Sequence, residues 1–125
     1  MEPGKIRLLV VDHNPLLREG LSLLIRLEPD LELLAIAATG GEAVELFRKH
    51  RPHVTLMDLD LPDRAGIRAI EQIRTIDPSA RVLGLVTYEW DECISEGIRA
   101  GAWGYVAKDR LNAELIPCIR QYCEH

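Results

Sequence analysis

The chain has 125 residues, which is enough for one domain and too few for two. Hydrophobic residues make up 47% and charged residues 28%, a composition that is typical of a globular protein and excludes collagen-like and disordered chains. The net charge is -5 and the basic residues are scattered, which argues against direct binding of nucleic acid. The longest apolar run, residues 33–38, is too short to span a membrane, and no signal-peptide core follows the N-terminus. We therefore expect residues 1–125 to form one cytoplasmic domain without membrane contact.

The first half of the chain alternates between a strand pattern and a helix pattern. A near-continuous apolar run predicts a strand over residues 6–11, buried on both faces. Asn14 and Pro15 then begin a helix, because Asn accepts from free amides of the first turn and Pro tolerates the first helical position. A second strand is predicted over residues 31–38, and Thr39 begins the next helix in capping-box spacing.

The second half continues the alternation. Strands are predicted over residues 54–57, 82–87 and 105–107, and helices over a segment carrying Ile67, Ile70 and Ile73, over residues 90–100, and after Asp109. The chain therefore contains five strand–helix units with short connections. Such a chain is expected to form a three-layer α/β domain, in which helices cover both faces of a doubly wound parallel sheet.

Polar residues follow four of the predicted strands. They are Asp12, Asp58, Thr87 and Lys108. In open parallel sheets the functional site lies beyond the carboxyl ends of the strands, so these side chains are expected to converge at one edge. A single Asp at a strand end is ordinarily a turn residue or a helix cap, but four polar groups from four strands together predict a site.

Several segments from Lys5 to about Tyr122 carry a resemblance to a known family. They are Val10-Val11-Asp12, Pro15-Leu16-Leu17-Arg18-Glu19-Gly20, Leu56-Met57-Asp58-Leu59-Asp60-Leu61-Pro62 with Gly66, and Ala100-Gly101-Ala102-Trp103-Gly104-Tyr105 with Lys108-Asp109. The sequence resembles the receiver domain of two-component response regulators. Its motifs are most similar to those of the branch that carries a C-terminal LuxR-type (NarL-type) helix-turn-helix module. We find no such module in these residues. The resemblance implies the CheY-like, flavodoxin-like fold with strand order 2-1-3-4-5.

The resemblance also implies the roles of individual residues. Asp58 would be the phosphoacceptor, which takes a phosphoryl group from a sensor histidine kinase as an aspartyl phosphate, and Lys108 would offset charge on the transferred oxygens. Asp12, Asp58 and the backbone carbonyl of Asp60 would hold Mg²⁺. Tyr105 matches the aromatic residue that changes orientation on activation. The chain is thus expected to be a signalling switch in a phosphorelay, a phosphoprotein and not a turnover enzyme, with at most self-phosphotransfer and autodephosphorylation.

Two positions depart from the family pattern. His13 stands where the family has a second acidic residue, so Mg²⁺ binding should weaken; we interpret His13 as a solvent-facing loop residue, with a role as a Zn²⁺ or Mn²⁺ ligand as the alternative. Val86 stands where the family has a Thr or Ser that bonds the phosphoryl group. Thr87 replaces that hydroxyl only if a bulge or turn rotates it toward the site. The Asp60 carboxylate is interpreted as an exposed loop group.

Two other functions compete with this prediction. With one metal ligand and the hydroxyl lost, the first alternative is a pseudo-receiver that acts as a phosphorylation-independent interaction or dimerisation module. A phosphatase with an Asp nucleophile is a remote alternative, based on Met57-Asp58-Leu59-Asp60. Homodimer or output contacts are expected at Trp90 and Trp103 if these side chains are exposed, and DNA contact only through the absent C-terminal module.

Overall fold

The computed structural model describes residues 4–123 and alternates strands with helices. Its elements in order are β1 (Ile6–Val11), α1 (Pro15–Arg26), β2 (Leu31–Ala37), α2 (Gly40–His50), β3 (Val54–Asp58), η1 (Pro62–Arg64), α3 (Ala65–Ile76), β4 (Arg81–Val86), α4 (Cys93–Ala100), β5 (Gly104–Ala107), η2 (Lys108–Arg110) and α5 (Leu111–Tyr122). The predicted strand–helix alternation is confirmed.

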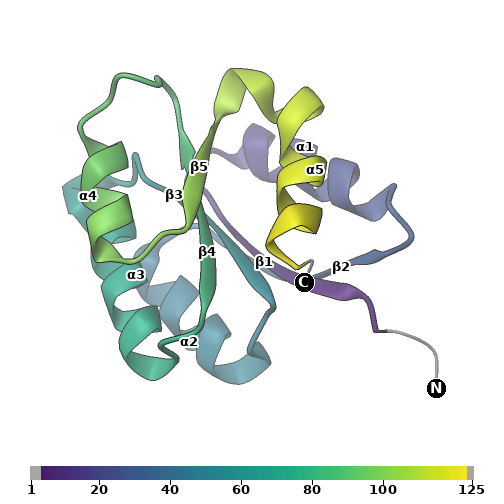
Figure 1. Cartoon of the computed structure of the whole chain (residues 1–125), viewed down its shortest axis with the longest axis horizontal. Coiled ribbons are helices and arrows are strands. Elements are labelled where there is room, and N and C mark those ends of the chain that lie inside the picture. The colour runs from purple at the N-terminus through teal and green to yellow at the C-terminus, as the bar shows by residue number, and fades with distance from the viewer. Residues whose placement is uncertain (1–3, 124–125) are drawn as a thin grey trace.

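The five strands form one parallel sheet in the order β2-β1-β3-β4-β5, as the resemblance implies. Helices α1 and α5 cover one face, and α2, α3 and α4 cover the other (Figure 1). The order reverses between β1 and β3, because β2 is placed outside β1 and the later strands are added on the other side. The carboxyl ends of β1 and β3 are therefore neighbours, at the point where open α/β sheets bind ligands.

Two apolar clusters hold the three layers together. One packs α1 and α5 against the sheet and is centred on residues such as Leu8, Ile25 and Leu115. The other packs α2 and α3 against the opposite face around residues such as Phe47, Met57 and Ile70. Strand β3 is buried along its whole length, which explains why its residues before Asp58 are apolar apart from Thr55.

The helix that follows β4 begins later than the sequence predicts. The expected start is residue 90, but α4 starts at Cys93. A turn occupies the preceding residues, in which the Asp91 amide donates to the Tyr88 carbonyl, and the Asp91 carboxylate accepts from the Cys93 amide at 3.1 Å. The Asp91 side chain thus accepts from the first amide of α4. This local hydrogen bond replaces a helical one, so the helix starts after Asp91. By contrast, Asn14 caps α1 as predicted, accepting from the Leu16 amide at 2.9 Å.

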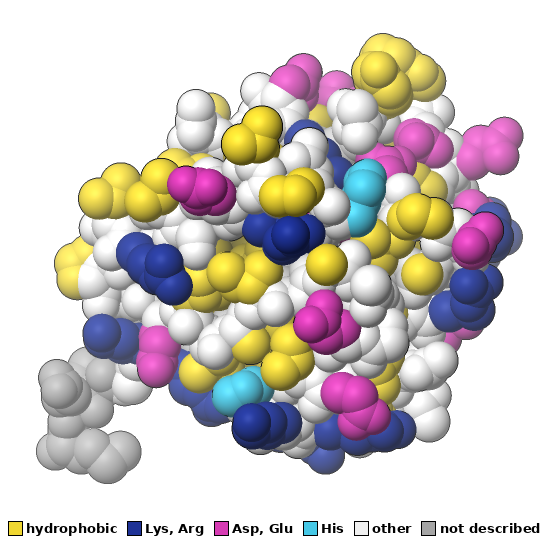
Figure 2. Space-filling view, turned by 180° about the vertical axis from the view of Figure 1, so that it is seen from behind, with side chains coloured by type: hydrophobic (Ala, Val, Ile, Leu, Met, Phe, Trp, Pro, Cys, Tyr) yellow, Lys and Arg dark blue, Asp and Glu magenta, His cyan; other side chains and the backbone are white. Residues whose placement is uncertain are grey.

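The following features concern the helices, the charged surface and the cysteines. Among the residues that the structure describes, no helix is long and apolar enough to cross a membrane. Basic and acidic side chains are interspersed on the face in Figure 2. Cys93, Cys118 and Cys123 are free thiols.

Candidate phosphoacceptor pocket at the sheet edge

Three of the four predicted strand-end residues meet at the carboxyl edge of the sheet. Asp12 follows β1, Asp58 ends β3, and Lys108 follows β5. The Lys108 ammonium lies 3.1 Å from Asp58 Oδ1 and 2.9 Å from Asp12 Oδ2. Both carboxylates are completely buried, while 15% of the lysine side chain is exposed. The predicted convergence is thus present for these three side chains.

The Asp58 carboxylate is held from three sides. Its Oδ1 accepts from the Asp60 amide at 2.8 Å and from the Lys108 ammonium. Its Oδ2 lies 2.6 Å from His13 Nδ1, a distance at which a protonated ring nitrogen donates to a carboxylate. A buried carboxylate needs such partners to stay ionised. The Asp58 side chain is therefore fixed in position by the Lys108 ammonium, the His13 ring and one backbone amide.

Asp12 leaves one oxygen available to a cation. Its Oδ1 accepts from the Asn14 amide at 2.8 Å, and the Arg18 guanidinium donates to its backbone carbonyl at 2.8 Å. Its Oδ2 is buried and pairs with the Lys108 ammonium at 2.9 Å. Two buried carboxylates that share one ammonium fit a divalent cation.

Lys108 stays protonated in this setting. Burial acts to lower its pKa, but the hydrogen bond and charge of Asp12, together with those of Asp58, outweigh that effect, so the pKa is raised above the ordinary lysine value. A fixed ammonium is therefore available beside Asp58 across the neutral pH range.

Thr87, the fourth predicted residue, lies elsewhere. Its hydroxyl donates to Asp60 Oδ2 at 2.8 Å, and its amide donates to the same oxygen at 2.8 Å. The structure therefore does not bring the Thr87 hydroxyl to Asp58. The reason is local: β4 ends at the buried Val86, no bulge rotates the next residue inward, and Asp60 fixes both polar groups of Thr87.

The Asp60 carboxylate also differs from the sequence interpretation as an exposed loop group. It is partly buried and bridges two loops, accepting from Thr87 and lying 3.6 Å from the Cys93 sulfur. Burial acts to raise the pKa of Asp60, but the hydrogen bonds from Thr87 outweigh it and lower the pKa. Because this carboxylate is turned to Thr87 and Cys93, it is not a second acidic group beside Asp58 of the kind that the phosphatase alternative needs.

The position of the His13 ring also differs from the sequence interpretation as a solvent-facing loop residue. It is 48% exposed, as expected of a loop residue, yet its Nδ1 contacts the Asp58 carboxylate. Asp12, His13 and Asp58 form a group whose possible ligand atoms all lie within 4.8 Å of one another. The sequence carried the relevant signal, since His13 directly follows a strand-end acid, but it did not show where the ring points.

The aromatic residues that the sequence singles out all lie on the surface. Tyr105 is in β5 and 39% exposed. Trp90 is 81% exposed and stacks on Tyr88 with ring centroids 5.1 Å apart, so it is available to a partner. Trp103 precedes β5, at the opposite end of the sheet from the pocket; it packs on Tyr122 and under the Arg81 guanidinium, and 48% of it is exposed.

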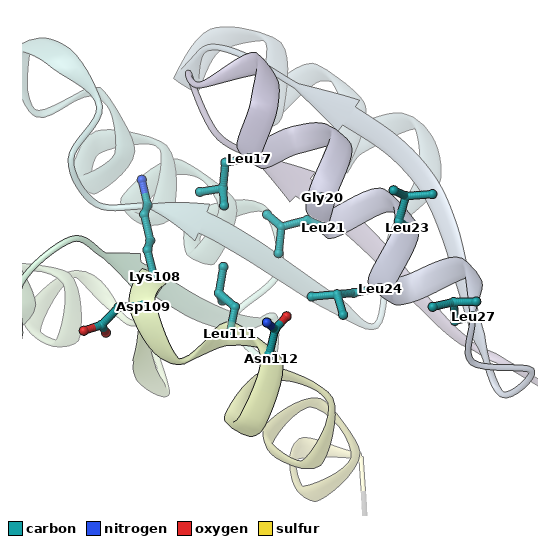
Figure 3. Close-up of a pocket in the computed structure, with 10 residues that line it drawn as sticks. All are labelled: Leu17, Gly20, Leu21, Leu23, Leu24, Leu27, Lys108, Asp109, Leu111 and Asn112. Carbon is teal, nitrogen blue, oxygen red and sulfur yellow. The ribbon is translucent and has the colours of Figure 1, made fainter.

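A groove of about 340 Å³ lies between α1 and the start of α5, next to the pocket (Figure 3). Leucine side chains of α1 and Leu111 line it, and Lys108 and Asp109 lie at one end. Leu16, Leu23 and Leu27 leave much of α1 apolar and exposed. The groove has no convergent polar groups, so the chemistry of the site belongs to the strand ends and not to this groove.

Comparison with known proteins identifies the family of this chain. A family model described as the response regulator receiver domain matches residues 8–120. The chain belongs to this family. The receiver is 38% identical over 120 residues to the transcriptional regulatory protein YxjL of Bacillus subtilis (strain 168), covering 96% of this chain and 55% of that protein. It is 31% identical over 116 residues to the oxygen regulatory protein NreC of Staphylococcus haemolyticus, covering 92% and 54%.

Solved structures agree. The crystal structure of a LuxR-family two-component response regulator from Aurantimonas sp. SI85-9A1 superposes with a TM-score of 0.87 at 37% identity, covering 94% of this chain and 84% of that one. The predicted fold and the predicted NarL/LuxR-type branch of response regulators are confirmed. Receiver domains are signalling switches. The chain spans about half the length of the curated relatives it matches.

Proposed function

We propose that this receiver accepts a phosphoryl group on Asp58 from a sensor histidine kinase and thereby switches a transcriptional output. The observation that supports it most is the Asp58 carboxylate itself, completely buried at the end of β3, with the Lys108 ammonium 3.1 Å from one oxygen. A nucleophile and a fixed positive charge at this spacing are what phosphoryl transfer to a carboxylate requires.

The residues act as follows in this proposal. A carboxylate oxygen of Asp58 forms a bond to phosphorus while the phosphorus–nitrogen bond to the kinase histidine breaks, which leaves an aspartyl phosphate. Lys108 already contacts Asp58, so its ammonium offsets charge on the transferred oxygens without a large movement. Asp12, Asp58 and the Asp60 backbone carbonyl would hold Mg²⁺, which supplies further positive charge to the phosphoryl oxygens. Tyr105 and the β4–α4 loop are proposed to respond to the new charge.

The partners follow from the relatives. The receiver would be a cytoplasmic unit, residues 1–125, that controls a C-terminal helix-turn-helix module in a longer protein. That module, and not the receiver, would contact DNA. A second copy of the chain is the proposed partner for the exposed apolar surface of α1, and Trp90 is a further candidate contact.

Two observations favour a second candidate function, a phosphorylation-independent interaction module. His13 occupies Asp58 Oδ2, and Thr87 gives its hydroxyl to Asp60, so the pocket lacks one acid and one hydroxyl for a phosphoryl group. A receiver of this kind would signal through partners that recognise the unmodified surface.

The test is the intact mass of the protein after incubation with acetyl phosphate and Mg²⁺, run beside Asp58→Ala and the matched variant Asp63→Ala. We expect one phosphoryl group on the wild type and on Asp63→Ala and none on Asp58→Ala. An adduct that persists in Asp58→Ala would show that another residue is the acceptor. No adduct on the folded wild type, while a conventional receiver is labelled alongside, would contradict the phosphoacceptor proposal and favour the second candidate.

A further inference from the structure

We propose that Asp12, His13 and Asp58 form a mixed nitrogen and oxygen site that selects a first-row transition-metal ion of the Co²⁺ or Zn²⁺ class over Mg²⁺. The proposal deepens the proposed function and rests on it, because the ion would lie in the phosphoacceptor pocket. It concerns which cation the pocket accepts.

The geometry supplies three ligands from one short segment and one neighbouring strand. The candidate ligand atoms of Asp12, His13 and Asp58 lie within 4.8 Å of one another, and His13 Nδ1 is 2.6 Å from Asp58 Oδ2. Metal–ligand bonds of roughly 2.0–2.2 Å place the ligand atoms of one ion roughly 3–4 Å apart. The arrangement is close to that spacing, and the half-exposed His13 ring has room to turn while both carboxylates stay fixed by the core.

A second observation, independent of the cluster, points to a cation. Asp12 Oδ2 is buried, and the Lys108 ammonium lies 2.9 Å from it. The same ammonium lies 3.1 Å from Asp58 Oδ1, so one positive charge is shared between two buried carboxylates. Buried carboxylates that share a single ammonium retain oxygen lone pairs that can bind a further cation.

The nature of the third ligand decides which cation is favoured. Mg²⁺ is a hard ion that depends on carboxylate charge and retains several waters, so exchanging an acid for imidazole removes much of its attraction. Imidazole suits first-row ions such as Co²⁺, Ni²⁺, Cu²⁺ and Zn²⁺, for which affinity rises from Co²⁺ to Cu²⁺ and falls again at Zn²⁺, whereas carboxylate, carbonyl and water ligands suit Mg²⁺. His13 therefore lowers the affinity of the pocket for Mg²⁺ but preserves its affinity for ions that bond to nitrogen.

A second cluster in the described residues, Asp60, Asp91 and Cys93, does not compete for this role. The Asp60 carboxylate already accepts from the amide and hydroxyl of Thr87. Burial, reinforced by the charge of Asp60, raises the pKa of the Cys93 thiol to about 12, so no thiolate is present to bind a metal at neutral pH.

The experiment is a titration of the tag-free protein with Co²⁺ and, separately, Mg²⁺, followed by calorimetry and by the visible absorption of Co²⁺. His13→Asp and His13→Ala are compared with the wild type, and His50→Ala, which removes a histidine far from the pocket, is the matched control. We expect the ratio of Co²⁺ to Mg²⁺ affinity to fall about tenfold or more in His13→Asp, because Mg²⁺ binds more tightly and Co²⁺ loses its nitrogen ligand. In His13→Ala, Co²⁺ affinity should fall while Mg²⁺ affinity changes little. His50→Ala should behave as the wild type.

An affinity ratio that is unchanged in both His13 variants would overturn the proposal. If a variant does not fold, the nitrogen shifts of the wild-type His13 ring, recorded by NMR with and without Zn²⁺, decide the point. A shift confined to Nδ1 supports ligation, and no shift contradicts it.

Phosphoryl labelling separates this inference from the proposed function. Labelling of Asp58 with Mg²⁺, combined with a Co²⁺ affinity that does not depend on His13, would leave the function standing and remove the metal proposal. Ligation of the metal by His13, combined with no labelling of Asp58 in the presence of either ion, would support the metal proposal and contradict the proposed function.

Discussion

Asp60 shows how a single carboxylate near Asp58 can join two loops. Its backbone amide donates to Asp58, and its side chain accepts from the amide and the hydroxyl of Thr87. The loop after β3 and the loop after β4 are thereby connected through one residue. Hydrogen bonds therefore link the Asp58 carboxylate directly to the start of the β4–α4 segment.

Replacing Asp60 by Asn should destabilise the receiver in a pH-dependent way. The folded-state pKa of Asp60 is lowered from its ordinary value of 3.8, so its ionised form contributes stability above that value. The contribution is lost as the pH falls through the folded-state pKa. We expect Asp60→Asn to lower the free energy of unfolding by about 1 kcal/mol at pH 7, because the group is partly exposed, and by less below pH 3.8.

Urea denaturation of both proteins at pH 7 and at pH 3 measures this effect. Asp63→Asn is the matched control, since Asp63 is an exposed acid in a left-handed conformation that Asn also adopts readily. A loss for Asp60→Asn that is as large at pH 3 as at pH 7 would contradict an ionic contribution.

Part of the pocket follows directly from the sequence, and part does not. Asp12, Asp58 and Lys108 follow apolar strands, and parallel strands end at one edge, so their meeting is predictable. His13 and Thr87 lie in loops, where the direction of a side chain depends on backbone turns and competing partners. The sequence did not reveal that Thr87 pairs with Asp60 or that His13 pairs with Asp58.

At the scale of elements, the start of α3 is pressed against the end of β3. A methyl group on Gly66 would overlap the carbonyl oxygen of Asp58, which belongs to the backbone and has no room to move. Glycine is needed at position 66 because the two backbones approach closely, and not because of its backbone conformation. The left-handed residues of this loop are Asp63 and Arg64. The sequence resemblance includes Gly66, but only the structure shows which contact requires it.

Gly66→Ala should therefore be more damaging than Gly97→Ala. A methyl group at Gly97 would come within 2.9 Å of Leu59 Cδ1, the end of a flexible side chain that can rotate away. We expect Gly66→Ala to lower the free energy of unfolding by about 2 kcal/mol or more, and Gly97→Ala by less than about 1 kcal/mol.

Gly20→Ala is the control for helix propensity in this comparison. Nothing lies within 4 Å of a methyl group at that position of α1, so we expect the substitution to stabilise the domain by about 0.5–1 kcal/mol. Equal losses for Gly66→Ala and Gly97→Ala in urea denaturation would contradict the proposed difference between backbone and side-chain contacts.

For the whole molecule, the three layers separate two kinds of surface. The strand ends carry the charged pocket, and two groups of exposed apolar side chains lie along α1 and in the β4–α4 segment, with others on α4 and around β5. The Asp60–Thr87 contact links the pocket to the second of these surfaces, close to Tyr88 and Trp90. The pocket and the exposed Tyr88–Trp90 surface are thus joined by direct hydrogen bonds, which suits the pocket to passing a local change of charge to a partner.

The charge of the whole receiver leads to a prediction about its output. The net charge is -5, and acidic and basic side chains are mixed on the face in Figure 2. Duplex DNA is bound mainly by neutralising phosphates with a basic surface, which this chain does not provide through its overall charge. We expect the isolated chain not to retard duplex DNA in a mobility-shift assay at moderate salt, with or without acetyl phosphate. The same chain joined to a helix-turn-helix module is the positive control. Retardation by the receiver alone, weakening as salt increases, would show that the receiver contacts DNA and that the output does not depend on a separate module.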